Sequence, residues 1–239
     1  SHCKVAIVGG GIMGVSLLYH LTKEGWNDIV LVEKGELTSG STWHAAGQCP
    51  HFVGSYNSAK IHNYSNKLYQ ELEKETGQST GWHGCGSIRL ALKQEDVDWF
   101  HYVKGILDNV GSPSEFISKD KILELHPFLK IDDVLCGLYT PEDGYTDPTS
   151  TTNAMAIAAR KAGAEIYRHN RVLEINQIAS GEWELSTEKG NIISEHVVNA
   201  AGSFGIEVGA MVGLSNIPSV NMIHHYLVTE NHPKIENRE

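Results

Sequence analysis

The spacing of glycines near the start of the chain constrains its fold more than any other feature. The pattern G-x-G-x-x-G at Gly9–Gly14 follows the β-rich run Lys4–Val8 and precedes a helical segment over residues 12–23. Residues 29–32 predict a second buried strand, with the acidic Glu33 at its end. In a βαβ unit such glycines permit a tight turn, a close approach to a pyrophosphate and helix–strand packing, and the acid binds ribose hydroxyls. The pattern therefore predicts a dinucleotide-binding unit in a doubly wound α/β fold.

Two other interpretations share this fingerprint. A glycine-rich turn can be purely structural, and an NAD-dependent dehydrogenase carries the same unit. The structural interpretation is disfavoured because strand, helix, second strand and acid are all in register. The NAD-dependent interpretation is disfavoured by the later pair Trp43-His44, for which such an enzyme has no use.

Composition and charge are those of a folded enzyme and exclude several classes. Apolar residues make up 41% and charged residues 20%, enough for a packed core. No apolar run approaches the ~20 residues that a membrane span requires. The net charge of −10 argues against nucleic-acid binding. The four cysteines are scattered without C-x-x-C spacing, which predicts free thiols in a reducing compartment and no metal site.

Periodicity beyond the first unit predicts an alternation between two lobes. Residues 81–143 carry no dinucleotide signature, and we expect them to form an inserted α+β substrate-binding lobe. Residues 1–80 and 144–214 are expected to form the Rossmann-type cofactor-binding part. The chain then crosses back, so that residues 215–239 belong to the substrate lobe, with a candidate strand over residues 223–229.

The run Gly40–Gly47 contains His44, eleven residues after Glu33. Eleven extended residues span at most ~35–40 Å. That reach can carry His44 from the ribose of a bound FAD to its far end, where a histidine can contact the flavin ring or bond to it covalently. The chain is therefore predicted to be a flavoenzyme with a tethered flavin.

Seven short segments carry a resemblance to a known family. They are Ile7–Gly11, Glu33–Lys34, Leu37–Gly47, Gly84–Ala91, Asp143–Pro148, Val198–Gly202 and His224–Tyr226. Together they resemble the dimethylglycine dehydrogenase and sarcosine dehydrogenase family of D-amino-acid-oxidase-like flavoproteins, over essentially the whole chain. The Trp-His-Ala-Ala-Gly run is specific to this branch, whereas the glycine fingerprint is not. The Gly-Ser-Ile-Arg-Leu-Ala stretch leans towards the dimethylglycine member.

The resemblance implies FAD as the cofactor, bound covalently through His44, with a non-covalent contact as the alternative. Ser41 and Thr42 would hydrogen-bond the pyrophosphate or ribitol, and Val172 would lend its backbone to the adenine edge. Phe204 stands where the family usually has tryptophan. The expected cofactor-binding residues are Gly9, Gly11, Ile12, Met13, Gly14, Glu33, Lys34, Gly40, Ser41, Thr42, Trp43, His44, Ala45, Ala46, Gly47, Gln48, Val172, Gly202 and Phe204, and no metal ligand is expected.

The implied reaction is FAD-dependent oxidative demethylation of an N-methylated glycine, with dimethylglycine favoured. A hydride moves from the N-methyl carbon to flavin N5, and the resulting iminium yields formaldehyde or a folate-trapped one-carbon unit. His224 and Tyr226 lie two apart on the candidate strand, so they would share a face over the flavin. A histidine there can take the proton of the substrate amine, which makes both residues catalytic candidates.

Several alternatives stay open. The substrate can be sarcosine or another secondary or tertiary amine, and the electron acceptor either oxygen or an electron-transfer flavoprotein. A non-catalytic regulatory paralogue also resembles the chain, but that branch lacks the tethering histidine. Family members continue into a late glycine-containing flavin segment and often a folate-binding region, so we expect these residues to be an N-terminal fragment, with tetrahydrofolate only in the full-length protein. The expected location is cytoplasmic for a bacterial protein and the mitochondrial matrix for a eukaryotic one.

Overall fold

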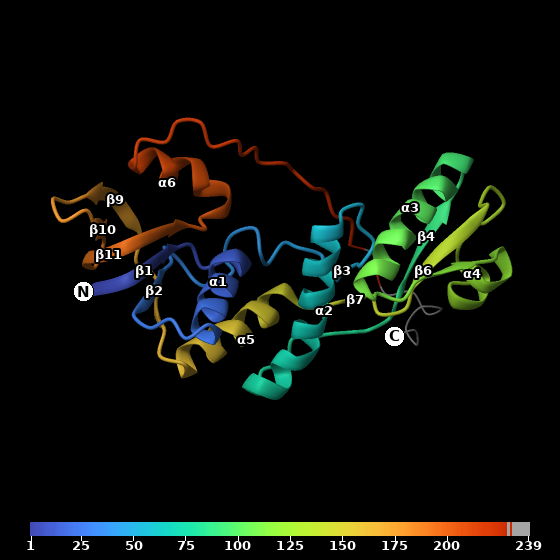
Figure 1. Cartoon of the computed structure of the whole chain (residues 1–239), viewed down its shortest axis with the longest axis horizontal. Helices are drawn as coiled ribbons and strands as arrows, with labels where there is room; N and C mark the ends of the chain where they lie inside the picture. The colour runs from blue at the N-terminus through green and yellow to red at the C-terminus, as the bar shows by residue number, and fades with distance from the viewer. Residues whose placement is uncertain (229, 231–239) are drawn as a thin grey trace. The chain divides into compact units, whose positions relative to one another are not determined.

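The computed structural model describes residues 1–228 and 230 (Figure 1). The chain divides into two compact units. The first unit holds residues 1–45, 72–79 and the described chain from Pro148 onward, and the second holds residues 46–71 and 80–147.

The first unit is built on a six-stranded sheet in which the expected βαβ unit is present. Its strand order is β8 (Glu165–Tyr167), β2 (Ile29–Val32), β1 (His2–Val8), β11 (Gly190–Asn199), β10 (Trp183–Thr187) and β9 (Val172–Gln177). The strands from β8 to β11 run parallel, and the β9–β10–β11 meander is antiparallel. Strand β11 is continuous and serves both the meander and the parallel sheet.

Two helices of the first unit pack against each other beside this sheet. They are α1 (Ile12–Lys23) and α5 (Pro148–Lys161). Alanines such as Ala154 and Ala158 are buried on α5 and let the helices approach closely. A 3₁₀ turn, η1 (Gly202–Phe204), leads from β11 into the short α6 (Gly205–Met211). One apolar cluster of the core combines residues from the parallel strands, the meander and α6, among them Val30, Ile175, Leu185 and Val208.

The second unit is an α+β unit with two small antiparallel sheets. One sheet has the order β4 (Ser87–Ala91), β6 (Cys136–Thr140) and β5 (Glu115–Ile117), and the other pairs β3 (Gln48–Cys49) with β7 (Gly144–Tyr145). Its helices are α3 (Gln94–Val110), α4 (Lys119–Leu125) and the greater part of α2 (Tyr56–Thr76). Apolar side chains of β6 pack against α3, with Leu138 and Phe100 at the centre.

The prediction of a strand over residues 223–229 is wrong for residues 223–228, which the structure describes. Residues 221–228 have no regular secondary structure, and Thr229 lies outside the described residues. A strand exists only where a neighbour completes its hydrogen-bond ladder. Among residues 1–228 and 230, no strand pairs with this segment.

The predicted division into cofactor-binding and substrate-binding parts stays a prediction, because compactness says nothing of what a unit binds. The observed units place residues 46–71 with the second unit and the described residues after 214 with the first. Within the described part of the chain, no helix combines the length and apolar character that crossing a bilayer demands.

Candidate functional site

Three loops of the first unit meet where its central parallel strands end. The Gly9 amide donates to the Val32 carbonyl, 2.9 Å away, and the Ala200 amide donates to the Val8 carbonyl, also at 2.9 Å. The segments following β1, β2 and β11 therefore lie at one edge of the sheet. The carboxyl edge of a doubly wound sheet, at the point where the strand order reverses, is where such folds bind ligands.

Two fingerprint glycines are required by close backbone packing at this edge. A Cβ on Gly9, whose φ is +118°, would lie 2.4 Å from the Ala200 carbonyl oxygen. A Cβ on Gly14 would lie 2.0 Å from the Gly9 carbonyl oxygen. Both contacts are with backbone that cannot swing away, so a larger residue would push the turn and helix α1 apart.

The amino end of α1 is suited to bind a pyrophosphate. The N-cap residue, Gly11, has no side chain, and the first turn has no acidic residue. The Thr42 hydroxyl accepts a hydrogen bond from the Ile12 amide at 3.0 Å, and the Met13 side chain is exposed. Amides in a first helical turn have no acceptor within the helix, and they bind anions together with the helix dipole. These features fit the diphosphate of a dinucleotide.

The carboxylate of Glu33 is held in the turn after β2. Its Oε2 accepts from the Gly10 amide at 2.7 Å, and its Oε1 accepts from the Gly35 amide at 2.8 Å. Each carboxylate oxygen has a second lone pair, which leaves capacity to accept from a diol. The arrangement fits a ribose and is disfavoured for a 2′-phosphate.

Residues after β2 contact residues after β11 at the same edge. The Lys34 ammonium lies 3.1 Å from the centroid of the Phe204 ring, a close cation–π contact. The Ser41 and Ser203 hydroxyl oxygens are 3.3 Å apart. Gly202, with a φ of +55°, begins the turn that brings Phe204 here. Phe204 thus occupies the edge where the sequence predicts a cofactor contact.

The Trp43 and His44 rings stack on each other and are both exposed. Their centroids are 3.8 Å apart, with the ring planes tilted by 34°. His44 Nδ1 lies 3.1 Å from the Gly40 carbonyl oxygen. Since a carbonyl can only accept, Nδ1 must carry the proton, and the neutral ring then has its free lone pair on Nε2. The turn therefore presents an exposed imidazole whose neutral form has its lone pair on Nε2.

The remaining predicted cofactor residues are divided between the two units. Ala45 ends the stretch that belongs to the first unit, and Ala46 begins the second. In the second unit the Gly47 carbonyl accepts from the Thr146 amide at 2.9 Å, and Gln48 pairs with Tyr145. Val172, in the first unit, starts β9 with its side chain buried in the core, so only its backbone is available for a ligand.

The structure does not bring the two catalytic candidates together on a strand. His224 and Tyr226 are both exposed, in a segment without regular secondary structure. The expectation that they share a strand face is therefore wrong for the described structure. Their assignment rests on the resemblance alone and stays a prediction.

Sequence reasoning missed a buried polar network in the second unit. The Asp143 carboxylate, 1% exposed, accepts from the His51 amide at 2.8 Å and lies 2.6 Å from His51 Nδ1. Its other oxygen accepts from the Ser87 and Thr140 hydroxyls, both at 2.5 Å. Burial by itself would raise the pKa of Asp143, but the hydrogen bonds from these three side chains outweigh it and hold the pKa below its ordinary value. Only the resemblance drew attention to Asp143, and it suggested no role.

Metal binding finds no support in the described residues, which contain no cluster of three or more His, Cys, Asp or Glu side chains able to hold an ion.

Comparison with known proteins places this edge in a family context. The profile of the FAD dependent oxidoreductase family, DAO, matches residues 4–239. The chain is 45% identical over 233 residues to mitochondrial dimethylglycine dehydrogenase of Rattus norvegicus, covering 98% of this chain and 27% of that protein. It is 41% identical to the mitochondrial pyruvate dehydrogenase phosphatase regulatory subunit of Mus musculus, covering 96% of this chain and 26% of that protein. With mitochondrial sarcosine dehydrogenase of Homo sapiens the identity is 34%, over 99% of this chain and 26% of that protein.

The chain thus spans about a quarter of the length of these relatives. Among solved structures, the L-proline dehydrogenase from P. horikoshii superposes with a TM-score of 0.83 at 27% identity, covering 91% of this chain and 57% of that chain.

Proposed function

The chain belongs to the FAD-dependent oxidoreductase family, and from this premise we propose that its protein oxidises the N-methyl group of dimethylglycine with a covalently held FAD. The observation that carries the proposal is the exposed His44 imidazole, presented by a turn that also places the Thr42 hydroxyl on the amino end of α1. The identity of 45% to a dimethylglycine dehydrogenase, against 34% to a sarcosine dehydrogenase, supports the choice of substrate.

The residues at this edge would hold the two ends of FAD differently. The amides at the amino end of α1 and the Thr42 hydroxyl would bind the pyrophosphate, and the Glu33 carboxylate would bind the ribose. Val172 would offer backbone groups to the adenine. His44, further along the chain, would reach the ring that reacts.

A covalent bond is favoured by the tautomer of the neutral ring that the His44 hydrogen bond selects. The Gly40 carbonyl accepts from Nδ1, so the lone pair of Nε2 could form a carbon–nitrogen bond to a flavin methyl carbon. That carbon would lose a proton, and the two electrons of the broken C–H bond would pass to the flavin ring, which its electron acceptor would reoxidise. The loop thereby keeps the ring in its nucleophilic tautomer. Trp43, stacked on one face of the imidazole, restricts the rotation of the ring.

The reaction requires that the substrate amine is neutral and that its N-methyl group is held in position with water excluded. When bound, the flavin accepts the hydride equivalent that the N-methyl carbon gives up. An ammonium has no lone pair to support the developing iminium, so the substrate must lose its proton first. His224 is our candidate to take that proton at a ring nitrogen, and Tyr226, two residues later, is the second catalytic candidate.

Replacing His224 by glutamine in the intact protein should slow reduction of the flavin by dimethylglycine roughly 100-fold, as for a lost acid–base group. The acidic limb of the rate profile should move or disappear, and the flavin content should stay unchanged. Anaerobic rapid mixing across pH measures both. His225→Gln is the matched control, and equal rates and profiles in all three proteins would remove His224 from the proposal.

The substrate assignment is tested by mixing the oxidised intact protein with dimethylglycine, sarcosine and betaine without oxygen. Dimethylglycine should bleach the flavin fastest. Betaine, a quaternary ammonium that has no proton to lose and no lone pair, should not react. Faster bleaching by sarcosine would transfer the proposal to the sarcosine branch. A protein that binds FAD but is reduced by none of the three would contradict the proposed substrate and favour another amine or a non-catalytic regulatory relative.

Partners and location follow from the same relatives as proposals. Oxygen and an electron-transfer flavoprotein are the two candidate acceptors, and tetrahydrofolate would concern a region outside these residues. The three relatives compared above are named as mitochondrial proteins, which favours the matrix if the protein is eukaryotic.

A further inference from the structure

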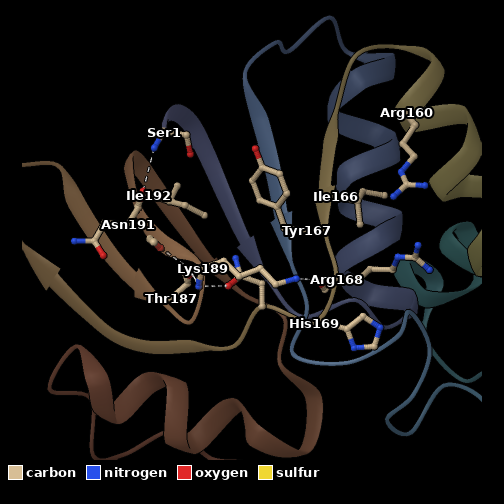
Figure 2. Close-up of a pocket in the computed structure, with 12 residues that line it drawn as sticks. Ser1, Arg160, Ile166, Tyr167, Arg168, His169, Thr187, Lys189, Asn191 and Ile192 are labelled. Atoms are coloured by element: carbon tan, nitrogen blue, oxygen red, sulfur yellow. Dashed lines mark hydrogen bonds between the residues drawn. The ribbon is translucent and has the colours of Figure 1, made fainter.

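One cavity of the first unit lies apart from the expected cofactor residues. It has a volume of about 570 Å³ and opens between β8 and the hairpin that joins β10 to β11 (Figure 2). This volume is within the range of roughly 300–1,000 Å³ that small-molecule sites occupy. None of the described residues that line it is among those expected to bind FAD.

Cationic side chains from three elements gather around this cavity. Arg160 comes from the last turn of α5, Arg168 and His169 follow β8, and Lys189 comes from the hairpin. Figure 2 shows the guanidinium groups of Arg160 and Arg168 on the same side of the opening, with Lys189 extended towards Arg168. Among the described residues that line the cavity none is acidic, although the chain as a whole carries a net charge of −10.

Nearby carboxylates neutralise only part of this charge. Glu36 pairs with Arg168 at 2.6 Å and with His169 at 2.7 Å, and hydrogen bonds from these two side chains hold the pKa of Glu36 below its ordinary value. Lys189 donates at 3.1 Å to the neutral carbonyl of Arg168. Within residues 1–228 and 230, no carboxylate forms an ion pair with Arg160 or Lys189. Two positive charges at the cavity therefore have no acidic partner in this part of the chain.

The rest of the wall is apolar and partly aromatic. Tyr167, Ile166 and Ile192 line it (Figure 2), and both isoleucines are buried. The Tyr167 hydroxyl donates to Glu165, so the ring is held in place and the hydroxyl is already used. A ligand with a flat hydrocarbon part would cover these apolar side chains, whereas an inorganic ion would leave them exposed to water.

We propose that this cavity binds an organic dianion, such as a phosphate monoester or a dicarboxylate. Arg160 and Lys189 bind its charged groups, because they are the cations that no described carboxylate neutralises. Arg168 adds one of the N–H groups that Glu36 does not use, since a guanidinium has five. The carbon skeleton lies against Tyr167. The inference does not depend on the proposed reaction, because it uses no cofactor or substrate residue.

The experiment uses the intact protein with its flavin bound, so that the cofactor site is filled. Isothermal titration calorimetry at low ionic strength with phenyl phosphate should show one site, weakened by added sodium chloride because salt screens exposed charges. Inorganic phosphate should bind more weakly, and phenol should not bind detectably. Equal affinities for phenyl phosphate and inorganic phosphate would overturn the organic part of the proposal, and no binding would overturn all of it.

Two variants locate the site. Arg160→Gln/Lys189→Gln removes both unpaired charges and should weaken phenyl phosphate binding roughly 10–100-fold, as expected for lost charge-assisted hydrogen bonds. Arg160→Glu/Lys189→Glu should abolish it, and circular dichroism checks that both variants are folded. Lys130→Glu, at a side chain that is 85% exposed in the second unit, is the matched control and should bind like the wild type. Loss of binding in the control, or its retention in the double variants, would contradict the proposal.

Discussion

Acid precipitation of the intact protein should leave its flavin in the pellet, and His44→Ala should release all of it into the supernatant. A non-covalent flavin dissociates when the fold that holds it is destroyed, whereas a carbon–nitrogen bond to Nε2 survives. The geometry behind this expectation is the Nδ1 hydrogen bond to the Gly40 carbonyl, which leaves Nε2 as the free nucleophile. Visible absorbance of pellet and supernatant measures the split.

The matched control for this prediction is a second exposed histidine. His126, in the second unit, lies edge-on to the Phe128 ring, and His126→Ala should keep its flavin in the pellet. Before precipitation, His44→Ala should still carry FAD, since the pyrophosphate and ribose contacts do not involve the imidazole. Free flavin from the unmutated protein would show that His44 makes at most a non-covalent contact. Retained flavin in His44→Ala would move the tether to another residue.

The first βαβ unit could be predicted from the sequence because its signals are local. The run before Gly9 and the run Ile29–Val32 are apolar enough to be buried on both faces of a parallel sheet, and both are strands. Helix α1 covers Ile12–Lys23, as the sequence predicts. Glycine positions and the acid after β2 carry most of the ligand-binding pattern in a single stretch of chain.

Other features depend on partners that are distant in sequence, and local patterns predict them less well. Ile61, Tyr64 and Leu72 share one face of α2 by helical spacing, yet only Leu72 of the three is buried. Residues 223–228 include the β-branched and aromatic side chains Ile223, Tyr226 and Val228, which are typical of a strand, but no described strand pairs with this segment. The pattern of a segment indicates which secondary structure it can form. Whether it forms depends on pairing or packing partners from elsewhere in the chain.

The network around Asp143 is the clearest feature of this kind, since its members come from three separate segments. Asp143→Asn should lower the free energy of unfolding by about 3–5 kcal/mol, as for the removal of one partner from a buried, hydrogen-bonded charged group. The asparagine amide nitrogen cannot accept, so donors on His51, Ser87 or Thr140 would be buried without a partner. Urea unfolding of the intact protein, followed by tryptophan fluorescence, measures the loss.

A graded pair of controls separates the network from a general effect of substitution. Ser87→Ala removes one donor and leaves the carboxylate with His51 and Thr140, so its cost should be about 1 kcal/mol. Asp132→Asn changes the same group at an exposed side chain and should leave the unfolding midpoint unchanged. Equal effects of Asp143→Asn and Asp132→Asn would contradict the stabilising role of the network.

The charge of Asp143 should make the stabilising effect of the network depend on pH, which packing alone would not do. Because the folded pKa of Asp143 is below its ordinary value of 3.8, the folded state binds its proton less readily than the unfolded state. The stabilisation is therefore fully present above that ordinary value and is lost as the pH falls towards the folded pKa. The difference in unfolding free energy between wild type and Asp143→Asn should be constant near neutrality and shrink below pH ~3.8. A difference that stays constant through this range would mean that Asp143 stabilises the unit by its shape and not by its charge.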